Sequence, residues 1–237
     1  MISAPPLAPR RDSLTISVIL PVLNEARSIN SIIGHLREQE PGVEIIVVDG
    51  DAAGGTIAAV SGNDVRAAVA APGRANQMNR GAALATGDIL LFLHADTLLP
   101  SGAFGRLRTC LADEDIVGGA FSLGIASPRW YFRVTERYVA CRTRITRIPF
   151  GDQAVFLRRA YFTKIGGYAS IPIMEDVELM VRIRRRGGRI SIIPAKVMTS
   201  PRRWEKEGVL YATVRNWTLQ VLYCCGVPPE RLARFYR

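Results

Sequence analysis

This chain of 237 residues has few of the side chains that hold structural zinc. It contains four cysteines and two histidines, and no two cysteines have the Cys-x-x-Cys spacing of zinc sites. Its basic residues are not accompanied by a helix-turn-helix, zinc-finger or RNA-binding pattern, and it has no P-loop. A structural zinc protein, a nucleic-acid-binding module and a P-loop protein are therefore not expected.

A secretory leader is not expected either. The arginine pair 10–11 precedes an apolar stretch, 14–23, as in a twin-arginine signal, but this stretch is short and the polar residues 24–25 follow it directly. Residues 1–13, with three prolines, are expected to form a loose leader. We therefore expect reduced thiols and a cytoplasmic location.

Positive charge is in excess. Lys and Arg number 31 against 21 Asp and Glu, which gives a formal net charge of +10. Such a chain attracts anionic partners, and without nucleic-acid motifs we favour phosphates and acidic membrane lipids. Hydrophobic residues make up 48% of the chain, which at this length is typical of a globular domain with a buried core.

Short apolar runs alternate with helical patterns through the first half. Strands are expected at 16–20, 43–48 and 89–93, each followed by a helix, and Asn24 is a plausible N-cap of the first helix. This alternation predicts an α/β fold with a mostly parallel central sheet and helices on both faces. Ligands of such sheets bind at the carboxyl ends of the strands.

The second half continues without a linker, so we expect one domain over residues 14–203, with the nucleotide in its first half and the acceptor in its second. Residues 204–237 are expected to form a C-terminal helical segment. Its apolar part, 208–227, carries one charge and is interrupted by Asn216 and Gln220, which disfavours a membrane-spanning helix. It either packs on the domain or lies, with basic flanks, in the interface of the cell membrane.

An aspartate and a histidine follow the third strand. Asp96 ends this strand in a polar segment, and carboxylate oxygens are natural ligands of Mg²⁺ or Mn²⁺. His94 lies two residues earlier, so both side chains could point the same way, and imidazole suits manganese better than magnesium. His94 is therefore either a metal ligand or a hydrogen-bonded structural residue.

Three further positions are candidates for ligand contact. Asp49 ends the second strand, where it could bind a base or ribose, or simply stabilise a turn. Arg74 follows Gly73 at a helix start, which suits a diphosphate. The acidic pair Glu175-Asp176 opens another helix, where it could complement the helix dipole or provide a general base.

The order of these features resembles the family 2 glycosyltransferases. The resemblance covers nearly all of the chain after residue 15. The motifs that carry it are Pro21-Val22-Leu23-Asn24-Glu25, Val47-Val48-Asp49-Gly50, Gly73-Arg74 with Asn79 and Gly81, Gly87-Asp88 to His94-Ala95-Asp96, Gly151-Asp152-Gln153, and Glu175-Asp176 with Arg182.

This resemblance implies an inverting enzyme with a GT-A fold. It places Asp49 at the base of the nucleotide, Arg74 at the diphosphate, Asp96 at the metal and Asp176 as the catalytic base. The remaining positions that it implies for the donor side are Pro21, Asn24, Glu25 and Asn79. Those that it implies for the acceptor or diphosphate are Asp152, Gln153, Glu175, Arg202, Arg203 and Trp204.

Two motifs depart from the family pattern. The usual Asp-x-Asp is His94-Ala95-Asp96, and the usual Gly-Gly-Ser-x-Asp-Gly-Thr turn is replaced by the sequence of residues 50–56. The chain is also similar to a compact bacterial branch with a His-Ala-Asp-Thr motif, some members of which are described as glycosylating a carotenoid carboxylate, diaponeurosporenoate.

We therefore expect transfer of a hexosyl unit from a nucleotide-diphosphate sugar, with a UDP-sugar favoured, to a hydroxyl or carboxyl acceptor such as a lipid or carotenoid. One alternative is a sugar nucleotidyltransferase, although such enzymes carry a glycine-rich loop with a lysine where residues 21–25 stand. The other is a nucleotide-sugar-binding protein of the same fold without catalysis.

Overall fold

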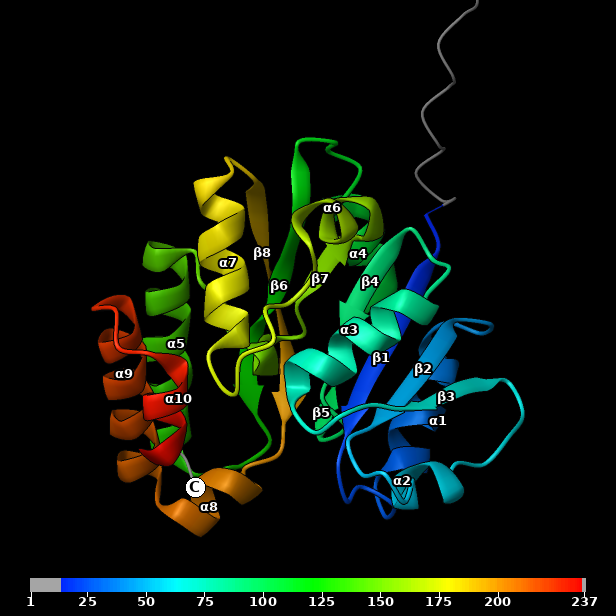
Figure 1. The fold of residues 1–237 in the computed structure, drawn as a ribbon, viewed down its shortest axis with the longest axis horizontal. Helices are drawn as coiled ribbons and strands as arrows, with labels where there is room; N and C mark the ends of the chain where they lie inside the picture. The colour runs from blue at the N-terminus through cyan, green and yellow to red at the C-terminus, as the bar shows by residue number, and fades with distance from the viewer. Residues whose placement is uncertain (1–13, 236–237) are drawn as a thin grey trace, which may run out of the picture.

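One mixed sheet organises the computed structural model, which describes residues 14–235 (Figure 1). Within that range the sheet has eight strands in the order β3-β2-β1-β4-β7-β6-β8-β5. The strands are β1 (Ile16–Val22), β2 (Glu44–Asp49), β3 (Val65–Val69), β4 (Ile89–Phe92), β5 (Thr97–Leu98), β6 (Ile116–Ile125), β7 (Phe156–Arg158) and β8 (Arg189–Thr199).

Most neighbouring strands are parallel. β3, β2, β1 and β4 pair in parallel, and so do β6 and β8. β7 is antiparallel to both β4 and β6, and β5 is antiparallel to β8. The carboxyl ends of β1, β2, β4, β6 and β8 therefore lie at one edge of the sheet. This arrangement confirms the mostly parallel sheet that the sequence predicts.

Helices cover both faces of the sheet. α1 and α4 pack on one hydrophobic core, and α3, α6 and α7 pack on a second one across the sheet. The larger helices are α1 (Ile29–Gln39), α3 (Arg74–Leu84), α4 (Ala103–Cys110), α5 (Trp130–Thr146), α6 (Arg159–Ile165), α7 (Glu175–Arg185) and α9 (Val209–Cys224). The shorter ones are α2 (Gly55–Ala58), η1 (Gly151–Gln153), α8 (Arg202–Glu207), α10 (Pro229–Leu232) and η2 (Ala233–Phe235).

The apolar runs of the sequence become strands that are buried on both sides. In β1, Val18 and Leu20 face the core beneath α1 and α4, while Ile19 faces the core beneath α3. α3 lies close to the sheet because Gly81 has no side chain: a Cβ there would stand 2.4 Å from Cγ2 of Ile19. This glycine of the family motif therefore has a packing role.

Several details differ from the sequence prediction. Asn24 is not an N-cap; it lies before the first helix with φ of 59°, and Ser28 occupies the cap position of α1. Asn is among the residues that adopt this left-handed conformation most readily. β8 reaches as far as Thr199 because it pairs along almost the whole of β6. The expected leader, residues 1–13, lies outside the described residues.

The C-terminal helices pack at one end of the molecule, opposite β3 (Figure 1). Leu219 of α9 and Leu232 of α10 are buried together with Ile173. The boundary expected between residues 203 and 204 falls within α8. Among residues 14–235 no helix combines the length and apolar character that crossing a bilayer requires.

Candidate active site

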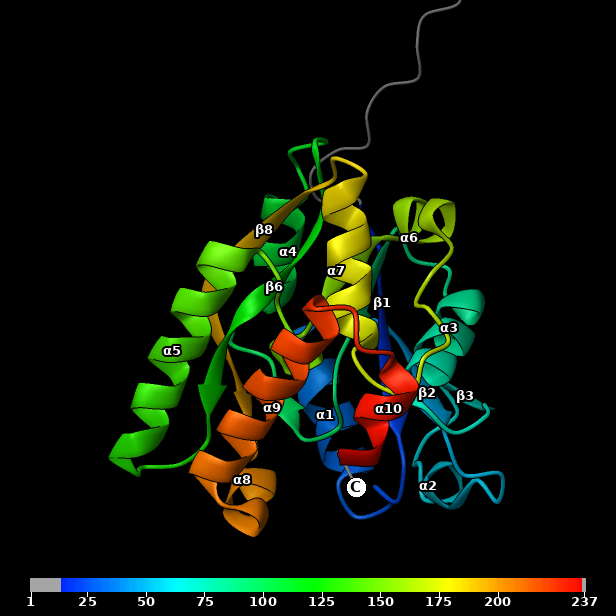
Figure 2. The same ribbon diagram turned by 60° about the vertical axis from the view of Figure 1, so that its left-hand side comes forward.

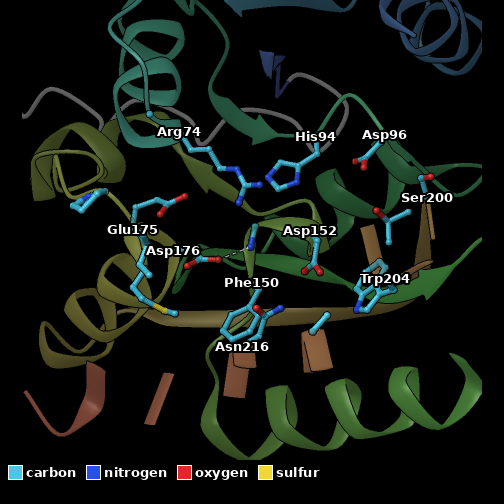
Figure 3. Close-up of a pocket in the computed structure, with 17 residues that line it drawn as sticks. Arg74, His94, Asp96, Phe150, Asp152, Glu175, Asp176, Ser200, Trp204 and Asn216 are labelled. Atoms are coloured by element: carbon cyan, nitrogen blue, oxygen red, sulfur yellow. Dashed lines mark hydrogen bonds between the residues drawn. The ribbon is translucent and has the colours of Figure 1, made fainter. Parts of the chain in front are cut away.

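A cavity of about 370 Å³ opens at the carboxyl edge of the sheet (Figure 3). Its size falls within the range of ligand pockets. Its walls come from the start of α3, the segment after β4, η1, the start of α7, the end of β8, and helices α8 and α9. The lining residues are Gly73, Arg74, His94, Asp96, Phe150, Gly151, Asp152, Pro172, Ile173, Met174, Glu175, Asp176, Thr199, Ser200, Trp204, Ala212 and Asn216.

On one side of the cavity, His94 and Asp96 follow β4. The backbone holds this segment in place, because the carbonyl of Asp96 accepts a hydrogen bond of 3.0 Å from the N–H of Ser200. The Thr97 hydroxyl donates to Oδ1 of Asp96 at 3.3 Å. Both predicted metal-site residues therefore border the same cavity, on the strand edge where the sequence placed them.

Within residues 14–235, the side chains near His94 and Asp96 do not form a complete metal site by themselves. Among the described residues, no cluster of three or more His, Cys, Asp or Glu side chains could hold a metal ion. This fits Mg²⁺ or Mn²⁺ shared with a ligand, because Mg²⁺ usually takes one or two carboxylates and completes its coordination with substrate phosphates and water. His94 and Asp96 could supply the protein's share.

Asp176 lies across the cavity, in the first turn of α7. Its Oδ2 accepts the N–H of Gly151 at 2.8 Å, and its Oδ1 accepts the N–H of Val177 at 2.8 Å. A Cβ on Gly151 would stand 3.2 Å from Nε2 of His94 and 3.7 Å from Oδ2 of Asp176. The bare glycine thus leaves open the space between the histidine and the aspartate.

Two other carboxyl groups of the cavity have raised pKa values. Burial, and next the charge of Asp176, raise the pKa of Glu175 to about 7. Burial also raises the pKa of Asp152 to about 6, against the opposing effect of Arg142. Oδ1 of Asp152 is buried without a hydrogen-bond partner in the structure. Raised pKa values of this kind are frequent at ligand and catalytic sites.

The raised pKa of Glu175 predicts a pH-dependent stability. A carboxyl group with a raised pKa binds its proton more tightly in the folded chain, so its contribution is complete below the unfolded pKa and is lost as pH rises through the folded pKa. We expect the free energy of unfolding of the metal-free protein to fall between pH 4.5 and about 7. Glu175→Gln should reduce this fall and raise the melting temperature above pH 7, measured by thermal unfolding across pH.

The matched control is Glu38→Gln, which removes an exposed acid from α1. It should leave the pH profile of the melting temperature as in the natural chain. If Glu175→Gln and the natural chain lost stability equally over this window, Glu175 would not be the group responsible.

Other predicted site residues do not line the cavity. Asp49 is fully buried, and its carboxylate accepts the backbone N–H groups of Asp51 at 3.0 Å and Thr56 at 2.9 Å, so it stabilises the turn after β2. The backbone N–H of Glu25 donates to the Thr56 hydroxyl at 3.2 Å, which ties the β1–α1 loop to the same turn. Neither Pro21 nor the exposed Asn24 borders the cavity. Their contacts with a nucleoside stay predictions.

Two amides of the family motifs bind backbone groups. The side chain of Asn79 accepts the N–H of Tyr168 at 2.9 Å and donates to its carbonyl at 2.8 Å. Gln153 is buried, donates to the carbonyl of Phe121 at 3.1 Å and accepts the N–H of Phe150 at 3.1 Å. Asn79 thus fixes the loop after α6, and Gln153 fixes η1 beneath the cavity.

The residues of the Arg202-Arg203-Trp204 motif in α8 do not all border the cavity. Trp204 borders the cavity, whereas Arg202 is exposed and lies 3.9 Å from Oε2 of Glu25, outside the lining. The side chain of Arg203 lies outside the described part of the chain. The ion pair of Glu25 and Arg202 therefore links the β1–α1 loop to α8.

Several residues of the cavity are not among those predicted from the sequence. One of them is Phe150, and Cζ of Arg142 lies 3.6 Å from the centroid of its ring. Another is Ser200, which follows β8. The polar Asn216, which interrupts the apolar C-terminal helix, faces this cavity. A polar side chain within an apolar helix is thus a signal that could have identified one of the missed residues.

The sequence and the fold were compared with known proteins. A family described as Glycosyl transferase family 2 matches residues 17–172. The mannosyltransferase PcManGT from Pyrobaculum calidifontis, solved in complex with GDP-Man and Mn²⁺, is similar with a TM-score of 0.65 and 24% identity, over 92% of this chain and 64% of that chain. S. aureus TarS 1-349 is similar with a TM-score of 0.59 and 17% identity, over 79% of this chain and 61% of that chain.

The chain thus spans slightly less than two thirds of each of these two structures. No curated protein matches its sequence.

Proposed function

Because this chain belongs to the family 2 glycosyltransferases and has the GT-A fold of the glycosyltransferases it resembles, we propose that it transfers a hexosyl unit, with inversion, from a nucleotide-diphosphate sugar to an acceptor. The observation that supports this proposal is the cavity of Figure 3, where Arg74, His94 and Asp96 stand opposite Asp176. These side chains come from three segments of the chain and combine a cation, metal ligands and a carboxylate in one place.

The proposed diphosphate site lies at the start of α3. Arg74 is the first residue of this helix and is exposed at the cavity, and Gly73 precedes it with φ of 118°. Helix N-termini attract anions through their unpaired N–H groups, and a guanidinium binds phosphate oxygens in pairs. Arg74 would therefore hold the diphosphate and orient the sugar towards α7.

Asp96, with His94, would hold a Mg²⁺ or Mn²⁺ ion together with the diphosphate. Such an ion offsets the negative charge that builds up on a leaving diphosphate. PcManGT, the similar structure, is in complex with Mn²⁺ and GDP-Man. An imidazole ligand favours Mn²⁺ over Mg²⁺, so we expect stronger donor binding with manganese.

Asp176 would act on the acceptor. Its carboxylate borders the cavity at the start of α7 and is held by the backbone of Gly151. An inverting transfer needs one carboxylate to take the proton of an attacking hydroxyl group, whereas glycoside hydrolases need two. A carboxylic-acid acceptor has already lost its proton at neutral pH, and Asp176 would then orient it.

The direct test is donor binding followed by turnover. Ligands that bind the folded state raise its stability, by about 2.7 kcal/mol at a hundred times the dissociation constant. We expect a UDP-sugar to raise the melting temperature with Mn²⁺ present, and to be hydrolysed slowly in a metal-dependent reaction. GDP-mannose is the competing donor in the same panel.

The same panel of nucleotide sugars distinguishes the proposed transferase from a second candidate function. A histidine in place of the first metal-binding aspartate favours a protein that binds nucleotide sugars without catalysis. Metal-dependent stabilisation without any hydrolysis or transfer would establish that candidate. If no nucleotide sugar were bound with either metal, both candidates would be rejected.

A further inference from the structure

Helices α5 and α9 lie side by side at one end of the molecule (Figure 2). Both helices expose apolar side chains. Trp130 and Ile145 of α5 are each 76% exposed, and Leu210 of α9 is 78% exposed. The exposed apolar residues recur at steps of four and seven residues on α5, and at steps of three and four residues on α9, which places them on one side of each helix. We call this surface the two-helix face; it comprises Trp130, Val134, Tyr138, Ile145, Leu210, Val214, Trp217 and Val221.

The exposed charged side chains on α5 and α9 themselves are basic. Arg137 and Arg144 are exposed on α5, while its only acid, Glu136, is 3% exposed and pairs with Arg133 at 2.9 Å and Lys196 at 2.7 Å. α9 contains no acid. Its only charged residue, Arg215, pairs with Glu207 of α8 at 2.5 Å. An apolar surface edged by arginines complements an anionic lipid surface.

A hollow of about 50 Å³ lies between the two helices. Tyr138 and Trp217 of the two-helix face border it, so it starts at this surface. At its inner end it shares Phe150, Asp152, Trp204 and Asn216 with the reaction cavity. The two spaces are therefore neighbours, and the exposed face leads towards the carboxylates of the site.

We propose that the two-helix face docks on an anionic lipid bilayer, and that the hollow between α5 and α9 admits the headgroup of an amphiphilic acceptor. The second part rests on the proposed sugar transfer. A helix of 16 or 17 residues is about 25 Å long, shorter than the hydrocarbon core of about 30 Å. Both helices would thus lie in the plane of the interface with their apolar sides in the lipid.

A second copy of the chain fits this surface less well. Pairing two such faces would bring the arginines of α5 close to those of the partner, and like charges across an interface are unfavourable. The acids of the C-terminal helices, Glu205, Glu207 and Glu230, lie on α8 and α10. The one acid of α5 and α9, Glu136, is buried and already paired with Arg133 and Lys196, so it is not available to the arginines of a second copy.

Flotation of the full chain with vesicles tests the docking. We expect binding to phosphatidylcholine vesicles that contain phosphatidylglycerol, weaker binding to phosphatidylcholine alone, and loss of binding at high salt. Val134→Asp and Leu210→Asp should each lower the bound fraction about tenfold. Val69→Asp is the matched control, since Val69 is 44% exposed on β3 at the opposite end of the sheet.

Tryptophan fluorescence gives a second measurement of docking. Brominated lipids should quench Trp130 and Trp217, and the double variant Trp130→Phe, Trp217→Phe should lose this quenching while Trp204 still emits. Equal flotation of Leu210→Asp and Val69→Asp, or quenching that persists in the double variant, would overturn the docking. Flotation needs no donor, so this result is independent of whether sugar transfer occurs.

The entry of an acceptor headgroup through the hollow between α5 and α9 is tested with a labelled nucleotide sugar and vesicles of a total bacterial lipid extract. We expect the label to appear in the organic phase. Thr213 borders the hollow, so Thr213→Phe fills it and should lower the amount of label in the organic phase while donor hydrolysis is unchanged. Absence of label in the lipid phase, despite donor hydrolysis, would reject the amphiphilic acceptor. Absence of hydrolysis as well would instead reject the proposed function.

Discussion

Asp176→Asn is expected to lower the turnover number for a hydroxyl acceptor by about 10²- to 10⁴-fold, the usual contribution of general base catalysis. The carboxylate borders the cavity and is the proposed proton acceptor. An asparagine keeps an oxygen that can accept the N–H of Gly151, now 2.8 Å from Oδ2. The fold and the donor affinity should therefore be unchanged, as measured by thermal unfolding and by titration with the nucleotide sugar.

The matched control for Asp176 stands two residues further along α7. Glu178 does not border the cavity and pairs with Arg182 at 2.7 Å. Glu178→Gln should leave turnover as in the natural chain and cost at most about 1 kcal/mol of stability. If Asp176→Asn also turned over at the natural rate with a hydroxyl acceptor, Asp176 would not be the base.

Asp96→Asn is expected to weaken metal-dependent donor binding by roughly a hundredfold or more, because a bound metal ion contributes several kcal/mol of charge stabilisation. Asp96 offers the carboxylate on the β4 side of the cavity. Titration with the nucleoside diphosphate, with and without Mn²⁺, measures the effect. The natural chain should lose affinity when Mn²⁺ is removed, and the variant should be insensitive to it.

Asp88→Asn is the control at the other end of β4. Asp88 accepts hydrogen bonds from the backbone and hydroxyl of Thr15 and does not border the cavity. This variant should keep the full response of donor binding to Mn²⁺. If Asp96→Asn kept that response as well, the metal would be bound elsewhere or not at all.

The parallel half of the fold could be predicted because its signals are local. The runs that form β1, β2 and β4 are mostly apolar, which is typical of strands buried on both faces, and a helix is expected after each. β7 could not be placed in this way. It has three residues, and its position between β4 and β6 depends on contacts with strands that lie far away in the sequence.

The candidate site was predictable in its residue types and less so in its contacts. Asp96 and Asp176 border the cavity as the family resemblance implies, because each lies at the end of an element whose direction the sequence indicates. Asn79 and Gln153 belong to the same motifs but bind backbone carbonyls and amides. A motif fixes a residue type at a position, and only the fold shows what that side chain touches.

The short strand β7 joins the half of the sheet that we propose for the donor to the half that we propose for the acceptor. β7 pairs with β4 on one side and with β6 on the other, which makes the sheet continuous between the two halves. The distance between Arg74 and Asp176 is thus set by the fold before a substrate binds. The donor and the acceptor must fit this existing distance between Arg74 and Asp176. Substitutions in α5, α8 and α9 can therefore change which acceptor is preferred without altering the donor half of the sheet.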